Sequence, residues 1–265
     1  MRRLIARCWL QIQRHTPDLR GKQWCSRALT WLLGPVPLHS RDGILLETRL
    51  SSAMDLSFLD PRGGGHNLIR DAIADLKPGD RMLDVGANTG FLTLLAARQV
   101  GSSGLVIAVE PSLREFKLLL TNLRLNRARN VLALNVAGGE QPGITRLTIE
   151  PDHTGLNRIG NNDQTSIDNQ PCQVLPLAAL NLGDLALVKI DTEGFELFTL
   201  RGLEPLLKQK RIRRLIVEIS PIFLRYHQQK ASDIYELLAH YGYHPKIYPS
   251  DKEQWDELFE CEQQQ

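Results

Sequence analysis

Three carboxylates stand close together in the second half of the chain. They are Asp191, Glu193 and Glu196, and they follow the run 185–190, which is typical of a strand buried in a parallel sheet. Lys189 precedes Asp191 by two positions, so both side chains are expected on one face of that strand. Open α/β sheets bind ligands at the carboxyl ends of their strands, which makes this cluster a candidate catalytic site. Lys189 is expected either to pair with a carboxylate or to help position or deprotonate an acceptor.

A glycine-containing turn lies earlier in the chain. There the apolar run 82–85 is followed by the turn 86–90 and by a predicted apolar helix, 91–97. Strand, glycine turn and helix in this order open a nucleotide-binding α/β unit. Gly86 would let a ligand approach the backbone closely, and the helix would present free N–H groups. Because Asn88 occupies the place of the second glycine of the dinucleotide fingerprint, the turn suits S-adenosylmethionine better than a pyrophosphate. A plain tight turn is the alternative.

Polar residues also stand at the ends of the neighbouring strands. Asp84 lies where the first strand meets the turn and is placed to accept hydrogen bonds. Glu110 directly follows the apolar strand 105–109, where nucleoside-binding α/β folds accept both ribose hydroxyls. The alternative for Glu110 is an acid stabilised by the dipole of the next helix. The segment 135–137, at the end of the predicted strand 130–136, could frame an adenine ring.

Strands and helices alternate over most of the chain, which implies one mainly parallel sheet with right-handed crossovers. We divide the chain into an N-terminal extension or cap, 1–66, a main domain, 67–250, and a polar tail, 251–265, which is expected to fray. The extension would either cover a substrate or have no role at the site. Residues 1–40 are expected to be helical and then loop-like, because two prolines interrupt the pattern. Strands of the main domain are expected at 82–85, 105–109, 130–136, 144–149, 185–191, 213–220 and 242–248.

The composition is that of a globular protein with enough material for a core, since 42% of the residues are hydrophobic. The 32 basic and 30 acidic residues give a net charge of +2, so no global field would recruit nucleic acid. The four cysteines are scattered without a C-x-x-C pair and are expected to be reduced thiols in a cytoplasmic protein. No feature of the sequence indicates an oligomeric state.

The N-terminal segment 1–14 is basic and only partly apolar. No apolar run in the chain approaches the ~20 residues that a transmembrane helix needs. The segment also lacks the long apolar stretch and cleavage site of a signal peptide. An amphipathic helix that rests on the domain is expected here. A basic helix that makes weak contact with a membrane surface or a partner is the alternative.

The motifs described above occur together in one family. The segments 84–90, 109–111, 135–137 and 188–196, in this order and spacing, resemble the FkbM family of S-adenosylmethionine-dependent methyltransferases. The similarity covers about residues 66–248, and 188–196 is its most specific part. It implies the class I methyltransferase fold, an α/β fold with a Rossmann-like, seven-stranded, mainly parallel sheet flanked by helices, whose final strand is antiparallel. It also implies O-methylation of a sugar, a glycoconjugate or another natural-product scaffold.

The resemblance assigns a role to each motif. The glycine turn would hold the methionine end of the cofactor, Glu110 the ribose and the segment 135–137 the adenine, and Asp191 would lie beside the methyl donor. The family usually has an aspartate after the Asn-Val-Ala stretch, where this chain has two glycines followed by Glu140, so the adenine contacts are open. The implied cofactor-binding residues are Asp84, Gly86, Ala87, Asn88, Gly90, Phe91, Glu110, Pro111, Ser112, Asn135, Val136, Ala137 and Asp191.

Methyl transfer to a neutral hydroxyl needs a base, because the hydroxyl is a poor nucleophile. We expect Asp191 or Glu193 to be that base, with Glu218, near the end of the strand 213–220, as a weaker candidate. The same three carboxylates could instead bind a divalent cation that lowers the pKa of the hydroxyl. Carboxylates at turns pair more often with lysine or backbone N–H groups, so no metal site is predicted.

Two other functions are compatible with a nucleotide-binding sheet. An NAD(P)-dependent oxidoreductase shares the sheet and the acidic strand end, but the missing second glycine argues against it. A non-catalytic nucleoside-binding domain would keep the fold without the chemistry, and the intact carboxylate motifs argue against it. The sequence identifies neither the small-molecule or glycan acceptor nor the hydroxyl that is methylated.

Overall fold

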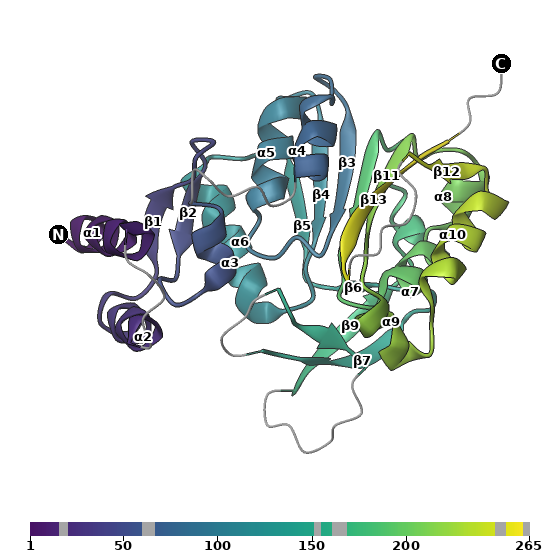
Figure 1. Ribbon diagram of the computed structural model, residues 1–265. Coiled ribbons are helices and arrows are strands. Elements are labelled where there is room, and N and C mark those ends of the chain that lie inside the picture. The colour runs from purple at the N-terminus through teal and green to yellow at the C-terminus, as the bar shows by residue number, and fades with distance from the viewer. Residues whose placement is uncertain (16–20, 60–66, 151–154, 161–168, 247–252, 262–265) are drawn as a thin grey trace.

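The computed structural model describes residues 1–15, 21–59, 67–150, 155–160, 169–246 and 253–261. Its centre is a seven-stranded sheet in the order β12-β13-β11-β10-β3-β4-β5 (Figure 1). Strand β13 runs antiparallel to both of its neighbours, and the other pairs in the sheet are parallel. The bounds are β3 (Arg81–Val85), β4 (Leu105–Val109), β5 (Val131–Leu134), β10 (Leu187–Ile190), β11 (Arg214–Ile219), β12 (Tyr243–Pro245) and β13 (Trp255–Cys261). This topology is the class I methyltransferase fold that the sequence predicts.

Helices cover both faces of the sheet, so its central strands are buried on two sides. Successive residues of a strand point to opposite faces, as Met82 and Leu83 do, and each face has its own apolar core. One core includes residues of α4 (Asn67–Ala74), α5 (Phe91–Val100) and α6 (Leu113–Leu125). The other includes residues of α7 (Glu196–Arg201), α8 (Glu204–Lys208) and α10 (Ala231–His240). Because both faces are covered, a ligand can reach the sheet only at the strand ends.

The position of the candidate site follows from the strand order. Strand β3 lies between β4, which follows it in the chain, and β10, which comes much later. The chain therefore leaves β3 and β10 toward different sides of the sheet, and this reversal opens a crevice at their carboxyl ends. The register aligns Asp84 with Lys189, so the glycine turn and the acidic cluster begin side by side.

A second, four-stranded sheet lies at the carboxyl ends of the main strands (Figure 1). Its order is β6-β9-β7-β8, and its buried residues, among them Leu147 and Ile159, form a separate small core. Three short helices follow later in the chain: η1 (Leu177–Leu180), α9 (Pro221–Leu224) and η2 (Arg225–His227). The strands are β6 (Ala137–Gly138), β7 (Gly143–Thr148), β8 (Arg158–Ile159) and β9 (Asn169–Leu175).

The N-terminal extension packs against the main domain. Its β-hairpin is fastened to α6, where the side chain of Asn122 accepts a hydrogen bond from the Glu47 N–H at 2.7 Å. None of the described helices combines the length and the apolarity that crossing a membrane requires. The elements of the extension are α1 (Arg2–His15), α2 (Lys22–Leu33), β1 (Val36–His39), β2 (Leu45–Thr48) and α3 (Ala53–Ser57).

Two expectations for the ends of the chain are wrong. Strand β13 lies in the polar tail that was expected to fray, and it is the antiparallel strand between β11 and β12. Phe259 and Leu258 explain its stability, because they pack into the cores on opposite faces of the sheet. Strand β1 occupies a segment that was expected to be a loop, and its Pro37 is accommodated opposite Glu47 of β2.

Candidate active site

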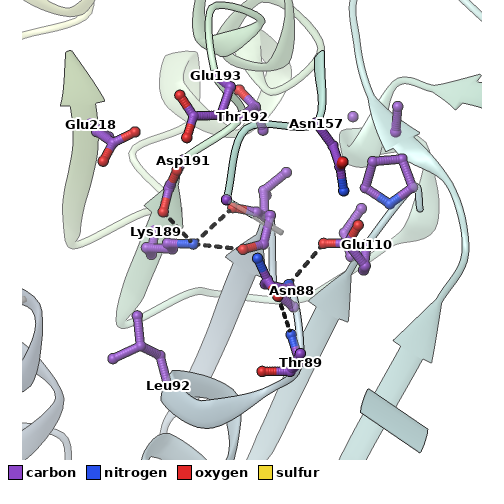
Figure 2. Close-up of a pocket in the computed structure, with 18 of the residues that line it drawn as sticks. Asn88, Thr89, Leu92, Glu110, Asn157, Lys189, Asp191, Thr192, Glu193 and Glu218 are labelled. Atoms are coloured by element: carbon purple, nitrogen blue, oxygen red, sulfur yellow. Dashed lines mark hydrogen bonds and ion pairs between the residues drawn. The ribbon is translucent and has the colours of Figure 1, made fainter. Parts of the chain in front are cut away.

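A cavity of about 350 Å³ opens at the carboxyl ends of β3, β4 and β10. Figure 2 shows Asp191, Glu193 and Glu218 gathered on one side of it and Asn88 with Glu110 on the other. The volume lies within the range of roughly 300–1,000 Å³ that is usual for small-molecule sites. The predicted cofactor motifs and the predicted catalytic cluster therefore share one cavity.

The glycine turn packs closely against the end of β10, in addition to leaving room for a ligand. Gly86 has a φ of +77°, and a Cβ at this position would lie 1.8 Å from the carbonyl oxygen of Asp191. Glycine is therefore required where the turn passes over the end of β10. Asn88 also has a positive φ, +50°, and its side-chain oxygen accepts a hydrogen bond from the Thr89 N–H at 2.8 Å. This hydrogen bond helps asparagine to replace the second glycine of the dinucleotide fingerprint.

Lys189 joins the ends of β3 and β10. Its side chain is almost completely buried, and its Nζ lies 3.2 Å from Asp191 Oδ2 and 3.5 Å from Asp84 Oδ1. It also donates a hydrogen bond to the Gly86 carbonyl at 2.7 Å. Burial alone would lower the pKa of this ammonium group, but Asp191 and Asp84 more than offset it, so the pKa is raised. The structure thus contains the carboxylate pairing of Lys189, which is the first of the two alternatives that the sequence left open.

Asp84 lies beneath the turn. It is fully buried and accepts a hydrogen bond from the Thr93 hydroxyl at 2.5 Å. Asn135 holds the loop after β4 in place, because its side chain donates to the carbonyl oxygens of Glu110 and Pro111. Five of the expected cofactor-binding residues are absent from the described lining of the cavity and would act on a ligand only through their neighbours: Asp84, Gly90, Ser112, Asn135 and Val136.

Glu110 is fixed on the wall opposite the acidic cluster. One of its carboxylate oxygens accepts the Asn88 N–H at 2.7 Å, and the other accepts the Ser112 N–H at 2.8 Å. Burial raises the pKa of Glu110 to about 8, although both backbone hydrogen bonds act in the opposite direction. Each oxygen keeps a further lone pair, so the ionised carboxylate, which predominates above pH 8, can accept two hydroxyl hydrogens without moving.

The catalytic candidates Asp191, Glu193 and Glu218 each place a carboxylate oxygen within 4.8 Å of the other two. Burial, and next the charge of Asp191, raise the pKa of Glu193 to about 9 and hold the pKa of Glu218 well above its usual value. Asp191 is paired instead with the ammonium group of Lys189, which stabilises its ionised form. At neutral pH the cluster therefore combines the carboxylate of Asp191 with a protonated Glu193, and its surroundings favour the protonated form of Glu218 as well.

Glu196 has a structural role. It is buried, and one of its oxygens accepts hydrogen bonds from the N–H and the hydroxyl of Thr192 and from the Gly194 N–H, each at 3.0 Å. These bonds close the turn that presents Asp191 and Glu193 to the cavity. Only two of the three neighbouring carboxylates in the sequence thus line the cavity.

Several lining residues come from segments that the sequence did not connect with the site. Phe58 of the extension stacks on Phe91 with 4.3 Å between the ring centroids, so the extension does contribute a wall. Thr89 and Leu92 are adjacent in the sequence to predicted residues, so the glycine-turn motif could have identified them. The lining residues that were not predicted are Phe58, Val85, Thr89, Leu92, Val109, Gly138, Leu147, Gly155, Leu156, Asn157, Ile159, Thr192 and Gln254.

The raised pKa of Glu193 predicts a pH-dependent effect of the variant Glu193→Gln. A carboxyl group whose pKa rises from 4.5 to about 9 on folding stabilises the fold fully below pH 4.5 and loses this contribution as the pH rises toward 9. The amide does not titrate, so the variant should gain stability over the wild type across this window, by up to about 1.4 kcal/mol per pH unit. Urea unfolding of both proteins at several pH values measures the difference. The exposed control Glu140→Gln should show no such trend, and a constant difference for Glu193→Gln would contradict the shift.

The comparisons with known proteins agree with this site. The methyltransferase FkbM domain matches residues 84–245. No curated protein matches the chain. Among solved structures, methyltransferase FkbM from Methylobacillus flagellatus KT is similar with a TM-score of 0.47 and 18% identity. The similarity covers 68% of this chain and 43% of that protein, so this chain spans less than half of its length.

Two further similar structures are those of a fibrillarin and of TrmK. Fibrillarin from Aeropyrum pernix, solved with natively bound S-adenosylmethionine, has a TM-score of 0.41 and 15% identity over 69% of this chain and 67% of that chain. TrmK from M. capricolum, in complex with S-adenosylhomocysteine, has a TM-score of 0.40 and 11% identity over 73% of this chain and 67% of that chain. These similarities are distant, and the assignment rests on the domain match, which spans more than half of the chain and includes the glycine turn, Glu110 and the acidic cluster. The chain therefore belongs to the FkbM family of S-adenosylmethionine-dependent methyltransferases.

Proposed function

We propose that the protein methylates a hydroxyl group of a sugar, a glycoconjugate or another natural-product acceptor. The observation that carries the proposal is the cavity in which the cofactor motifs face Asp191, Glu193 and Glu218. When bound, S-adenosylmethionine supplies a methyl group on a positively charged sulfur. The protein must hold this cofactor, orient the acceptor oxygen and remove its proton.

The residues present fit the cofactor. Glu110 offers two fixed oxygens for the ribose hydroxyls, and Asn88 stands next to it with its backbone on the cavity. Ala137, Leu147 and Ile159 supply an apolar wall that suits the adenine. The turn 86–89 would receive the methionine end, which is small enough for a turn whose second glycine is replaced.

The acidic cluster suits an acceptor with several hydroxyl groups. Asp191 would accept the proton of the reacting hydroxyl, which is expected to contribute about 10²–10⁴-fold to the rate. Glu193, which is protonated at neutral pH, could donate a hydrogen bond to a neighbouring oxygen of the same molecule, and the raised pKa of Glu218 favours the same role for it. A sugar ring presents several oxygens close together, whereas an isolated alcohol would offer a partner to fewer of these carboxyl groups.

Binding of the cofactor tests the first half of the proposal. By calorimetric titration we expect the wild type to bind S-adenosylmethionine and not NAD(P)H. Above pH 8, where Glu110 is ionised, Glu110→Gln should weaken this binding about 10- to 150-fold, because a hydrogen bond to a charged group contributes roughly 1.5–3 kcal/mol. The control Glu236→Gln, at an exposed position on α10 outside the cavity lining, should bind normally. Tight binding of a nicotinamide cofactor would instead support an oxidoreductase.

Transfer of a labelled methyl group to pooled sugars, glycolipids and aglycones tests the second half. Label in a hydroxyl-bearing acceptor would confirm an O-methyltransferase, and transfer to nitrogen or carbon alone would contradict the proposed acceptor class. Complete absence of transfer, with the cofactor bound, would favour a non-catalytic binding domain.

Two proposals concern the surroundings of the enzyme. We propose the cytoplasm as its compartment, because all four cysteines, Cys8, Cys25, Cys172 and Cys261, are free thiols. We also propose that nucleic acid is not its acceptor, because a net charge of +2 provides little attraction for a polyanion.

A further inference from the structure

The helices α1 and α2 form a hairpin at the N-terminal end of the molecule, outside the main sheet (Figure 1). The inner sides of the two helices are already occupied. Ala6 is buried in a small core with β1, and Trp9 and Leu29 pack against that core. Trp9 Nε1 and Gln13 Nε2 both donate hydrogen bonds to Ser26 Oγ, at 3.0 and 2.8 Å. The side chains that point outward are therefore not spare core residues of this domain.

Both helices carry strongly exposed apolar side chains. Trp24 and Trp31, which are 75% and 84% exposed, stand seven residues apart and thus on one face of α2. On α1, Leu4 and Ile12 are 67% and 50% exposed and lie on one face, eight residues apart. Exposed tryptophans are rare on monomeric soluble proteins, and apolar faces of this kind mark interaction surfaces.

The hairpin segment is strongly basic. Residues 1–34 contain seven basic residues and one acidic residue, so the other 231 residues carry a net charge of −4. Arg3 and Arg7 are exposed one turn apart on α1, in the row next to Leu4. An apolar helical face bordered by arginines is complementary to a surface with anionic groups above an apolar layer.

We propose that the α1–α2 hairpin binds the surface of a bilayer that contains anionic phospholipids. The indole rings of Trp24 and Trp31 would enter the boundary between headgroups and acyl chains, the region that tryptophan prefers. The basic residues would contact lipid phosphates. A second copy of the chain is disfavoured as the occupant of this face, because two hairpins that each carry six net positive charges would repel each other.

The hairpin is held in the orientation that binding needs. The guanidinium group of Arg2 donates hydrogen bonds to the carbonyl oxygens of Leu33 and Pro35, which ties the start of α1 to the end of α2. Lys22 Nζ donates to the Gln13 carbonyl at 3.2 Å near the other end of the helix pair. The exposed tryptophans of α2 are thus held on a preorganised helix pair, and binding would not have to order it first.

Cosedimentation of the full chain with vesicles tests the proposal. We expect binding to vesicles of phosphatidylcholine mixed with phosphatidylglycerol, and much weaker binding to phosphatidylcholine alone or at high salt. The double variant Trp24→Ala with Trp31→Ala should lower the partition coefficient at least about tenfold. Arg3→Gln with Arg7→Gln should lower it about 30-fold, since each basic residue near the surface contributes about 1 kcal/mol.

Matched variants elsewhere on the surface distinguish binding through the hairpin from nonspecific adsorption of the protein to vesicles. Ile144→Ala removes an apolar side chain that is 83% exposed on β7, and Lys117→Gln with Arg124→Gln removes two exposed charges from α6. Both controls should bind vesicles like the wild type, and circular dichroism should show that every variant is folded. Equal loss in the controls, or no binding to mixed vesicles, would overturn the proposal. So would a dimer in solution that the tryptophan variant makes monomeric.

Discussion

Replacing Asp191 with asparagine is expected to lower kcat by about 10²–10⁴-fold, the usual contribution of a general base. Among the three clustered carboxyl groups, Asp191 is the one paired with an ammonium group, and its side chain lines the cavity. The amide preserves the shape but cannot accept the proton. Lys189 keeps Asp84 as a partner, so the fold and the affinity for S-adenosylmethionine should change little. Steady-state kinetics and calorimetric titration measure the two effects separately.

Glu193→Gln is the matched control for this variant. Burial raises the pKa of Glu193 to about 9, so at neutral pH the amide replaces a carboxyl group that is already protonated, and kcat should change only a few-fold. The assignment would be wrong if Glu193→Gln abolished turnover and Asp191→Asn did not. EDTA should leave the wild-type rate unchanged. A loss with EDTA that Mg²⁺ reverses would identify the cluster as a set of metal ligands instead.

Buried parallel strands were the best predicted part of the fold. Strand β4 has the predicted bounds, 105–109, and β3 and β11 differ by one residue at one or both ends. These strands are covered on both faces, so their sequences are nearly continuous apolar runs. Strand β13 carries three acidic residues in seven, and nothing local indicates burial. Glu257 of β13 is buried and accepts a hydrogen bond from the Tyr235 hydroxyl at 3.1 Å, and that partner lies on α10, far away in the sequence.

The site residues divide in the same way, into those that local sequence patterns predict and those whose position depends on tertiary packing. The ends of β3, β4 and β10 could be placed together because strand order fixes which ends are neighbours. Phe58 and Asn157 reach the cavity from the extension and the second sheet, whose positions depend on packing between distant segments. The sequence also left Asp191 and Glu193 equal as bases. Their difference arises from burial and from the position of Lys189, which exist only in the folded chain.

Replacing Lys189 with methionine is expected to lower the free energy of unfolding by about 3–5 kcal/mol, the usual result of removing one partner of a buried ion pair. Methionine fills a similar volume but leaves Asp84 fully buried beside a second carboxylate, Asp191, without the ammonium group that pairs with both. The Gly86 carbonyl also loses its hydrogen bond from Nζ, which weakens the junction of β3 and β10. Urea unfolding at neutral pH measures the change. The control Lys208→Met, at an exposed position on α8, should lie within about 0.5 kcal/mol of the wild type.

A double variant shows whether the loss comes from the unpaired charge or from packing. In Lys189→Met combined with Asp84→Asn, the buried carboxylate is gone, and the amide that replaces it can still accept the hydrogen bond of the Thr93 hydroxyl through its oxygen. If charge dominates, the double variant should be more stable than Lys189→Met alone, because an uncompensated buried charge is more unfavourable than none. Additive losses would show that Lys189 acts mainly through packing and its bond to Gly86. In that case the ionised state of Asp191, on which the assignment of the base depends, would have to be maintained by the solvent at the mouth of the cavity rather than by Lys189.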